Sequence, residues 1–183
     1  MAHVKSSGRG EKPVTTRRRP ARAGADSPLP PWSTEGVSQR VRVYLPATLT
    51  TVAALHRDRR LPPGPAFAVT PALRAELGED DLEELEYQAF RLAADASLAL
   101  LRQDPTAPRR RVVISADARV QLVDGGREGR VQLTEPVPVS AVAAIHLDDL
   151  ETEPEVAAAL TSDGEVDEEL SWYDVSELPQ LVG

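Results

Sequence analysis

The sequence has no cysteine, which excludes disulfides, thiol nucleophiles and thiolate zinc sites. A metal ion could be held only by histidine and carboxylate side chains. Aromatic residues make up only 4% of the chain, so a core must be built mainly from alanine, valine and leucine. No stretch approaches the roughly 18 consecutive apolar residues of a membrane span. These absences predict a protein without a membrane segment.

Positive charge is missing from the last third of the chain. Residues 131–183 contain 13 Asp and Glu and no Lys or Arg, whereas residues 41–130 contain 13 of each sign. Residues 1–40 carry 8 basic and 3 acidic residues, a net charge of +5. The chain as a whole has a net charge of −8. A domain this acidic repels polyanions, so nucleic acid is not the expected partner despite the basic N-terminal segment.

Residues 1–40 are rich in Gly, Ser, Pro, Arg and Thr and almost lack periodic apolar residues. Such a composition buries too little surface to offset the entropy of ordering, so we expect a disordered basic extension. The segment has paired arginines without an apolar run behind them, so it lacks the hydrophobic region of an export signal and predicts a cytoplasmic protein. An alternative hypothesis is that translation begins at Val41 and that the extension results from a wrongly assigned start codon.

The remaining residues, 41–183, suit one α+β domain with an acidic C-terminal part. Period-2 alternation predicts a strand in "VRVYL", ended by Pro46, and Thr48 is expected to cap the helix that follows. The clearest helix lies in "DDLEELEYQAFRLAADASLALLRQ", where apolar residues recur at three- and four-residue steps. The repeat of "RVQL" on either side of Asp-Gly-Gly predicts a hairpin.

Further strands are predicted in "AFAVT", "RRRVVISA" and "VPVSAVAAIHLDD", and a short helix in "PEVAAALT". The stretch "EELSWYDVSEL" suits either a last strand or an amphipathic helix. The expected fold is therefore α+β, with a mixed β-sheet and helices packed on it, and a ferredoxin-like sandwich is the first candidate.

Candidate chemistry is concentrated in "HLDD", where His146 lies within three residues of Asp148 and Asp149. On a strand, His146 and Asp148 would point to the same side and could act as a base and its orienting partner. Asp117, on a neighbouring strand, is a further candidate. The motif does not supply the three protein ligands of a usual metal site, and no cofactor motif is complete, so neither metal nor cofactor is predicted.

Trp172 and Tyr173 are two of the six aromatic residues beyond position 40, and they lie in the acidic C-terminal part. Adjacent large aromatics most often pin a terminal element to the core through the area that they bury. Because Trp and Tyr are also enriched at interface hot spots, both are candidate binding residues.

Several segments together resemble a family of small actinobacterial proteins known only as a domain of unknown function. They are "RVYLPATL", "GPAFAVTPALR", "ELEYQAFRLAADASLALL", "APRRRVVISAD", "PVPVSAVAAIHLDD" and "ELSWYDVSELPQLV". The resemblance spans nearly all of residues 41–182, with a shorter hairpin loop around Gly125 and Gly126. The resemblance implies a chain that begins almost at the first strand, which agrees with the hypothesis that translation starts at Val41. The resemblance implies no site residue.

The leading functional hypothesis is a non-enzymatic domain that binds an unknown protein or small-molecule partner, with Trp172, Tyr173 and the acidic C-terminal part as the contact surface. It depends on the negative charge of that part and on the lack of a complete catalytic motif. The alternative is a small metal-assisted or acid–base enzyme that uses His146 with Asp148 or Asp149.

Overall fold

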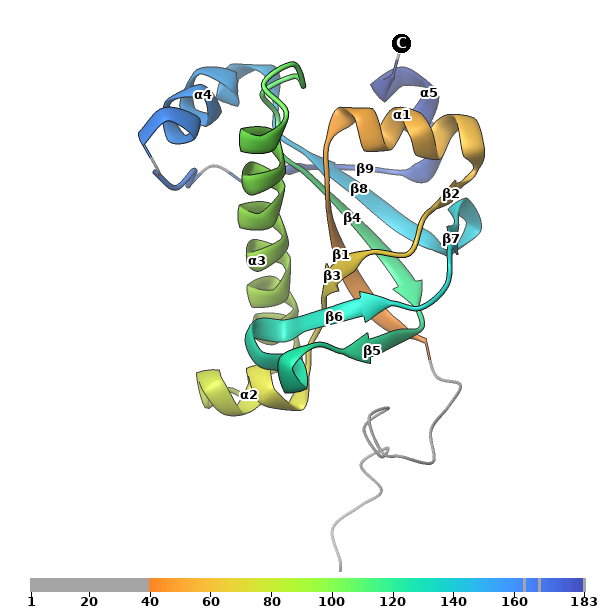
Figure 1. Ribbon diagram of the computed structural model, residues 1–183, viewed down its shortest axis with the longest axis vertical. Coiled ribbons are helices and arrows are strands. Elements are labelled where there is room, and N and C mark those ends of the chain that lie inside the picture. Colours follow the sequence, from red (N-terminus) through yellow and green to blue (C-terminus); the bar gives the residue numbers. More distant parts are fainter. Residues whose placement is uncertain (1–39, 163, 168, 183) are drawn as a thin grey trace, which may run out of the picture. The chain divides into compact units, whose positions relative to one another are not determined.

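The computed structural model describes residues 40–162, 164–167 and 169–182, so the predicted extension over residues 1–40 lies outside it except for Arg40. Figure 1 shows how the elements are arranged. The strands are β1 (Val41–Ala47), β2 (Arg60–Leu61), β3 (Pro65–Phe67), β4 (Val112–Ala118), β5 (Val120–Leu122), β6 (Arg130–Leu133), β7 (Val137–Pro138), β8 (Val142–Leu147) and β9 (Ser171–Tyr173). The helices are α1 (Leu49–Asp58), α2 (Pro71–Leu77), α3 (Leu82–Gln103), α4 (Glu153–Ser162) and α5 (Leu178–Leu181), with short 3-10 turns between several elements.

Seven strands form one sheet in the order β5-β6-β3-β1-β4-β8-β9, and β2 pairs separately with β7. The longest pairing joins β1 to β4 over seven residues, from Val41 opposite Ala118 to Ala47 opposite Val112. β1 continues through Pro46, which the sequence had suggested as its end. A proline is tolerated there because β3 pairs with β1 only at Tyr44, so no ladder partner needs an N–H on that side.

Helices cover both faces of the sheet, because the central strands are apolar on both. Val112, Val113 and Ile114 of β4 are consecutive and completely buried. Alternate residues of such a strand point to opposite faces, so each face needs its own cover. The face of Val43, Leu45 and Ile114 packs against α1 and α5, and the face of Tyr44 and Val113 packs against α3.

Local capping sets where the first long elements begin. Thr48 accepts a hydrogen bond from the backbone N–H of Thr51, and the Thr51 hydroxyl accepts one from the backbone N–H of Thr48, which closes a capping box at the start of α1. Asp81 caps α3 by accepting from the N–H groups of Glu83 and Glu84. The cap at Thr48 follows the sequence prediction, and α3 lies within the stretch predicted to be a helix.

Ser97 of α3 joins the helix to the sheet. Its completely buried hydroxyl donates to the carbonyl of Ala47 at 2.7 Å and accepts from the N–H of Val112 at 2.9 Å. The end of β1 and the start of β4 are thus tied to the same turn of α3.

The predicted hairpin is confirmed as β5 and β6, which pair between Val120 and Leu133. Its connection needs several residues in the left-handed region, including Gly125, Gly126 and Gly129. At Gly129 a side chain is also excluded by space, because a Cβ there would lie 2.8 Å from the carbonyl oxygen of Ala68.

The α+β class predicted from the sequence is confirmed. Two finer expectations differ from the structure. The pairings between described strands are antiparallel rather than mixed. A ferredoxin-like sandwich carries its helices on one face. Here α1 and α3 lie on opposite faces, because the central strands are apolar on both.

The undecided C-terminal stretch contains both kinds of element. Ser171–Tyr173 forms β9 at one edge of the sheet, and the residues after it form a turn and α5. In the described part of the chain, no helix is both long enough and apolar enough to cross a lipid bilayer.

Candidate functional site

His146 lies on β8 and points to the α3 face of the sheet. Its Nε2 is 3.0 Å from the Oγ of Ser115, with which it shares a hydrogen bond, and its ring meets the ring of Phe90 edge to face at 4.8 Å. Burial lowers the pKa of His146 to about 4, so the imidazole is neutral near pH 7. Ser115 is only 3% exposed. The Ser115–His146 pair fills space between the sheet and α3, and the Ser115 hydroxyl is not accessible to a substrate.

Tyr44 lies on the same face of the sheet. It lies opposite Ser115 in the β1–β4 pairing, and its ring meets Phe90 edge to face at 5.9 Å. Burial is the main cause that raises the pKa of Tyr44 to about 12, so the phenol also stays neutral.

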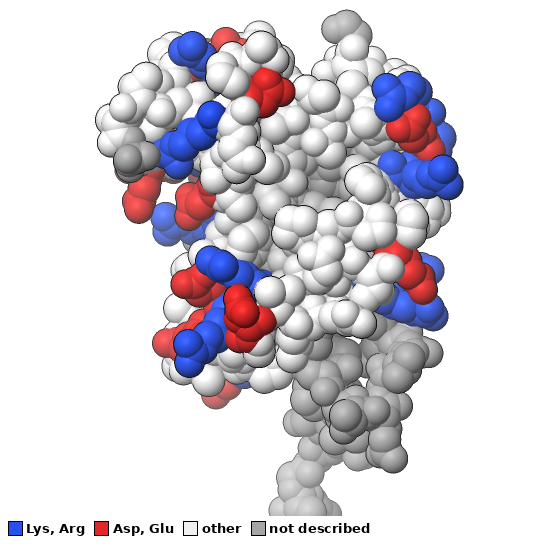
Figure 2. All heavy atoms as spheres, viewed as in Figure 1, with Lys and Arg blue, Asp and Glu red and all other residues white. Residues whose placement is uncertain are grey.

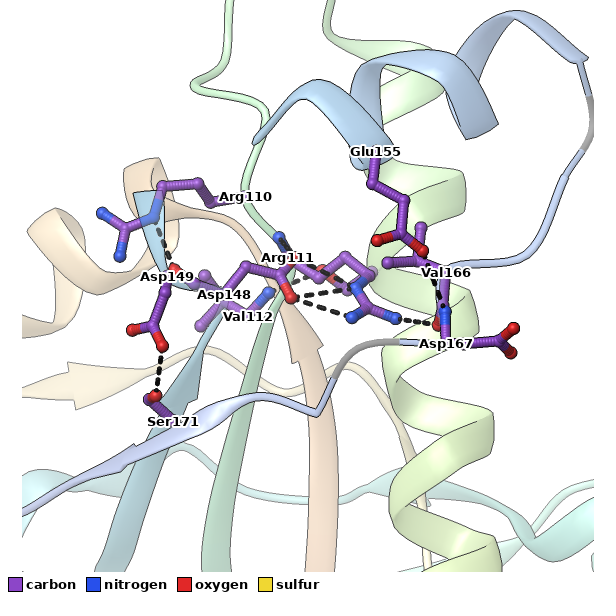
Figure 3. A network of polar contacts seen from close by, with 10 residues as sticks. Arg110, Arg111, Val112, Asp148, Asp149, Glu155, Val166, Asp167 and Ser171 are labelled. Carbon is purple, nitrogen blue, oxygen red and sulfur yellow. Dashed lines mark hydrogen bonds and ion pairs between the residues drawn. The ribbon is translucent and has the colours of Figure 1, made fainter. Parts of the chain in front are cut away.

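Asp148 is completely buried and is bound by Arg111, which is 3% exposed (Figure 3). The guanidinium donates from Nη2 to Oδ1 at 2.8 Å and from Nε to Oδ2 at 3.0 Å. The backbone N–H of Arg111 adds a third bond to Oδ2, at 2.7 Å. Arg111 Nη1 also donates to the carbonyl of Val166 at 2.9 Å, which attaches the C-terminal segment to the start of β4.

The other two candidate carboxylates lie apart from His146. Asp149 accepts a hydrogen bond from the hydroxyl of Ser171 at 2.8 Å. Asp117 forms an exposed ion pair with Arg42, at 2.9 Å. Among the described residues, no three His, Cys, Asp or Glu side chains are placed to hold a metal ion. Among the described residues, His146 makes no hydrogen bond or ion pair with an aspartate, so the acid–base alternative stays a prediction.

Trp172 and Tyr173 point to opposite faces of β9. Tyr173 is partly buried and packs against the core cluster beneath α1 and α5. Trp172 lies opposite His146 in the β8–β9 pairing and is 60% exposed. Only Trp172 of the two is therefore presented as a large accessible surface.

A groove of about 1070 Å³ lies where α1 faces the C-terminal end of α3, and the β2 region closes one side of it. We call it the α1–α3 groove. Its walls are Thr48, Thr50, Thr51, Ala54, Asp58, Arg60, Leu61, Pro62, Pro63, Leu100, Gln103, Asp104 and Pro136. Figure 2 shows that this face of the molecule is hollowed and uncharged at its centre, with charged side chains around the margin.

Polar groups of the groove differ in how far they are already engaged. The carboxylate of Asp104 accepts two hydrogen bonds from Thr106, and Asp58 is paired with Arg57. Within the described structure, the side chains of Thr50 and Gln103 make no hydrogen bond to the protein. These two can therefore bond to a ligand without breaking a contact inside the protein.

Sequence reasoning missed the α1–α3 groove because its walls come from four separate segments, 48–63, 100, 103–104 and 136. No spacing motif can connect residues that are so far apart in the chain. The only local signal was the "LPP" sequence at Leu61, since two prolines hold a backbone extended and leave its surface apolar.

A protein-family profile matches residues 41–182, and its description is a family of unknown function. This confirms the resemblance to a family of unknown function over these residues. No curated protein and no solved structure matches the chain. The match assigns no site residue.

Proposed function

This chain belongs to the family of unknown function DUF6912 through residues 41–182, and we propose that it is a ligand-binding domain that holds a neutral small molecule in the α1–α3 groove. The size and lining of the groove carry this proposal. Ligand sites are typically concavities of about 300 to 1000 Å³, mostly apolar and with a few polar groups that fix orientation. The α1–α3 groove has this size and this mixture.

The apolar walls indicate the body of the ligand. Ala54, Leu61 and Leu100 supply aliphatic surface, and Pro62 and Pro63 form a rigid side. Prolines lose little conformational entropy on binding, so a ligand packed against them does not have to order a mobile wall. A flat or aliphatic molecule of low polarity suits these contacts.

The polar residues indicate the ends of the ligand. Thr50 offers a hydroxyl that can donate or accept, and Gln103 offers an amide that can do both. Three charged residues, Asp58, Arg60 and Asp104, also line the groove. Both carboxylates are already engaged, Asp58 by Arg57 and Asp104 by Thr106, so the lining does not strongly favour an anion or a cation. We expect hydroxyl, carbonyl or amide groups on a ligand without net charge.

The proposal is tested by a thermal-shift screen of the full chain against a panel of neutral metabolites, including nucleosides, amides and aromatic alcohols. A ligand that binds the folded state raises the melting temperature by mass action. Amide chemical shifts mapped by NMR for each hit should change at Thr50, Ala54, Leu100 and Gln103.

Two variants on α1 make a matched pair for this test. Ala54→Arg places a long side chain in the groove, whereas Ala53→Arg adds the same side chain at an exposed position that does not line it. We expect Ala54→Arg to abolish the shift and Ala53→Arg to retain it. Equal responses of the two variants, or shift changes that map elsewhere, would contradict the proposal, and so would a panel without any hit.

A further inference from the structure

β9 is an open edge of the seven-stranded sheet. Its three residues pair with β8 on one side. In the part of the chain that the structure describes, no strand pairs with its other side. Backbone N–H and C=O groups alternate between the two sides of an antiparallel strand, so this open side presents unpaired donors and acceptors. Such an edge is a template for one more strand.

Trp172 provides an anchor next to that edge. It is 60% exposed, although tryptophan is a residue that proteins usually bury to a large extent. Its ring lies on the α3 face of the sheet, because it is directly opposite His146 in the ladder. An added strand would place its own alternate side chains on the same face, beside the indole.

The charges around β9 select the partner. Glu169 precedes the strand and Asp174 and Glu177 follow it, while Asp149 contacts Ser171 from the neighbouring loop. Lys and Arg are absent from residues 131–183 altogether. Arg91 and Arg111 line a pocket together with Glu169, but no ion pair among the described residues joins an arginine to Asp149, Glu169, Asp174 or Glu177. The guanidinium of Arg110 donates to the backbone carbonyl of Asp148 (Figure 3). A second copy of this acidic edge would be repelled, and a basic strand would be attracted.

We propose that the open side of β9 binds an extended, lysine- or arginine-rich peptide segment of a partner protein as an additional strand, with Trp172 against one of its cationic side chains. Backbone hydrogen bonds to β9 supply the affinity, as in other cases of strand addition. The indole attracts a cation through its ring face. The flanking carboxylates set the preference for a basic sequence. This site is separate from the α1–α3 groove, so it does not depend on the function proposed for that groove.

The test uses the full chain with Trp32→Phe, so that the remaining tryptophan, Trp172, reports binding through its fluorescence. The probe is a short acetylated and amidated peptide of alternating lysine and valine. Two control peptides accompany it. One has glutamate in place of every lysine, and the other carries N-methyl groups on alternate backbone amides, which removes the donors of a strand.

We expect saturable binding of the basic peptide, weakened by added salt because the attraction is between exposed charges. The glutamate peptide and the N-methylated peptide should not bind. Trp172→Ala, followed by calorimetry because the fluorophore is lost, should weaken binding by about tenfold or more. Leu150→Ala removes another exposed apolar side chain, 66% exposed and outside β9, and should leave the affinity unchanged.

Equal binding of the methylated and unmethylated peptides would overturn strand addition. Equal binding of the glutamate peptide would overturn the charge argument. Absence of binding to the folded chain would overturn the site itself. A concentration-dependent dimer that Trp172→Ala abolishes would identify a second copy as the occupant and would likewise refute the proposal.

Discussion

Replacement of Asp148 by Asn should lower the free energy of unfolding of this domain strongly, because it breaks a buried ion pair. Asp148 is completely buried, and its carboxylate holds the 3% exposed guanidinium of Arg111 through bonds of 2.8 and 3.0 Å. Asn keeps the shape of the side chain and removes its charge. Its NH₂ group must then face an N–H of Arg111, where the carboxylate accepted hydrogen bonds.

The magnitude follows from burial. Removal of one partner of a buried ion pair costs about 3–5 kcal/mol of folding free energy, because the other charge stays out of water without compensation. For a domain of this size, each kcal/mol lowers the melting temperature by roughly 3 °C, so a decrease of about 9–15 °C is expected. Urea denaturation followed by circular dichroism measures the free energy directly.

Two control variants distinguish the effect of burying the ion pair on stability from the effect of losing a charge. Asp117→Asn breaks the exposed pair with Arg42 and should cost no more than about 1 kcal/mol. The double variant Arg111→Met, Asp148→Leu removes both charges and should recover most of the stability lost by Asp148→Asn. A cost for Asp148→Asn that is as small as that of Asp117→Asn would refute the reasoning.

The remaining predictions concern three other positions. Burial lowers the pKa of His146 to about 4 in the folded state, whereas its pKa in the unfolded chain is about 6.5, so between these pH values mainly the unfolded state takes up a proton. The free energy of unfolding should therefore decrease as the pH falls from about 6.5 toward about 4, by on the order of 2 kcal/mol after allowance for partial exposure. Urea titrations across this range should show a weaker pH dependence of that free energy in His146→Gln. Ser97→Ala removes the hydroxyl that serves two buried backbone groups and should cost about 1–3 kcal/mol, with faster amide exchange at Val112, and unchanged exchange there would contradict the bridging role. Gly129→Ala should be more destabilising than Gly125→Ala in thermal melts, because only at Gly129 would the new Cβ meet a backbone oxygen, at 2.8 Å.

Local elements were largely determined by the sequence alone. The helix at Leu82–Gln103 could be predicted because its apolar residues recur with the period of a helix, a pattern that is visible within a few residues. The same holds for Thr48 and for the hairpin around Gly125. Propensity, capping and turn chemistry depend on neighbours in the chain, so one sequence is enough to find them.

The covering of both sheet faces could have been predicted from the consecutive apolar residues at Val112–Ile114, which do not alternate. What the sequence could not supply was the partner of each polar group. Asp148 lies two residues from His146 in the chain, and yet its carboxylate is bound by Arg111, which is 37 residues away. Trp172 and Tyr173 looked equivalent until the pairing of β9 placed one outside and one against the core.

The sequence by itself thus determined the class of fold, the start of its main helices and the uneven charge along the chain, since each depends on composition or on short-range periodicity. Only the tertiary structure decided where the α1–α3 groove lies, which carboxylate forms a buried ion pair and which aromatic ring is accessible. These three features depend on segments brought together from distant parts of the chain. The groove depends on the placement of α1 and α3, whereas the Arg111–Asp148 pair and the exposure of Trp172 depend on the pairing of β8 with β4 and β9. No local pattern encodes either arrangement.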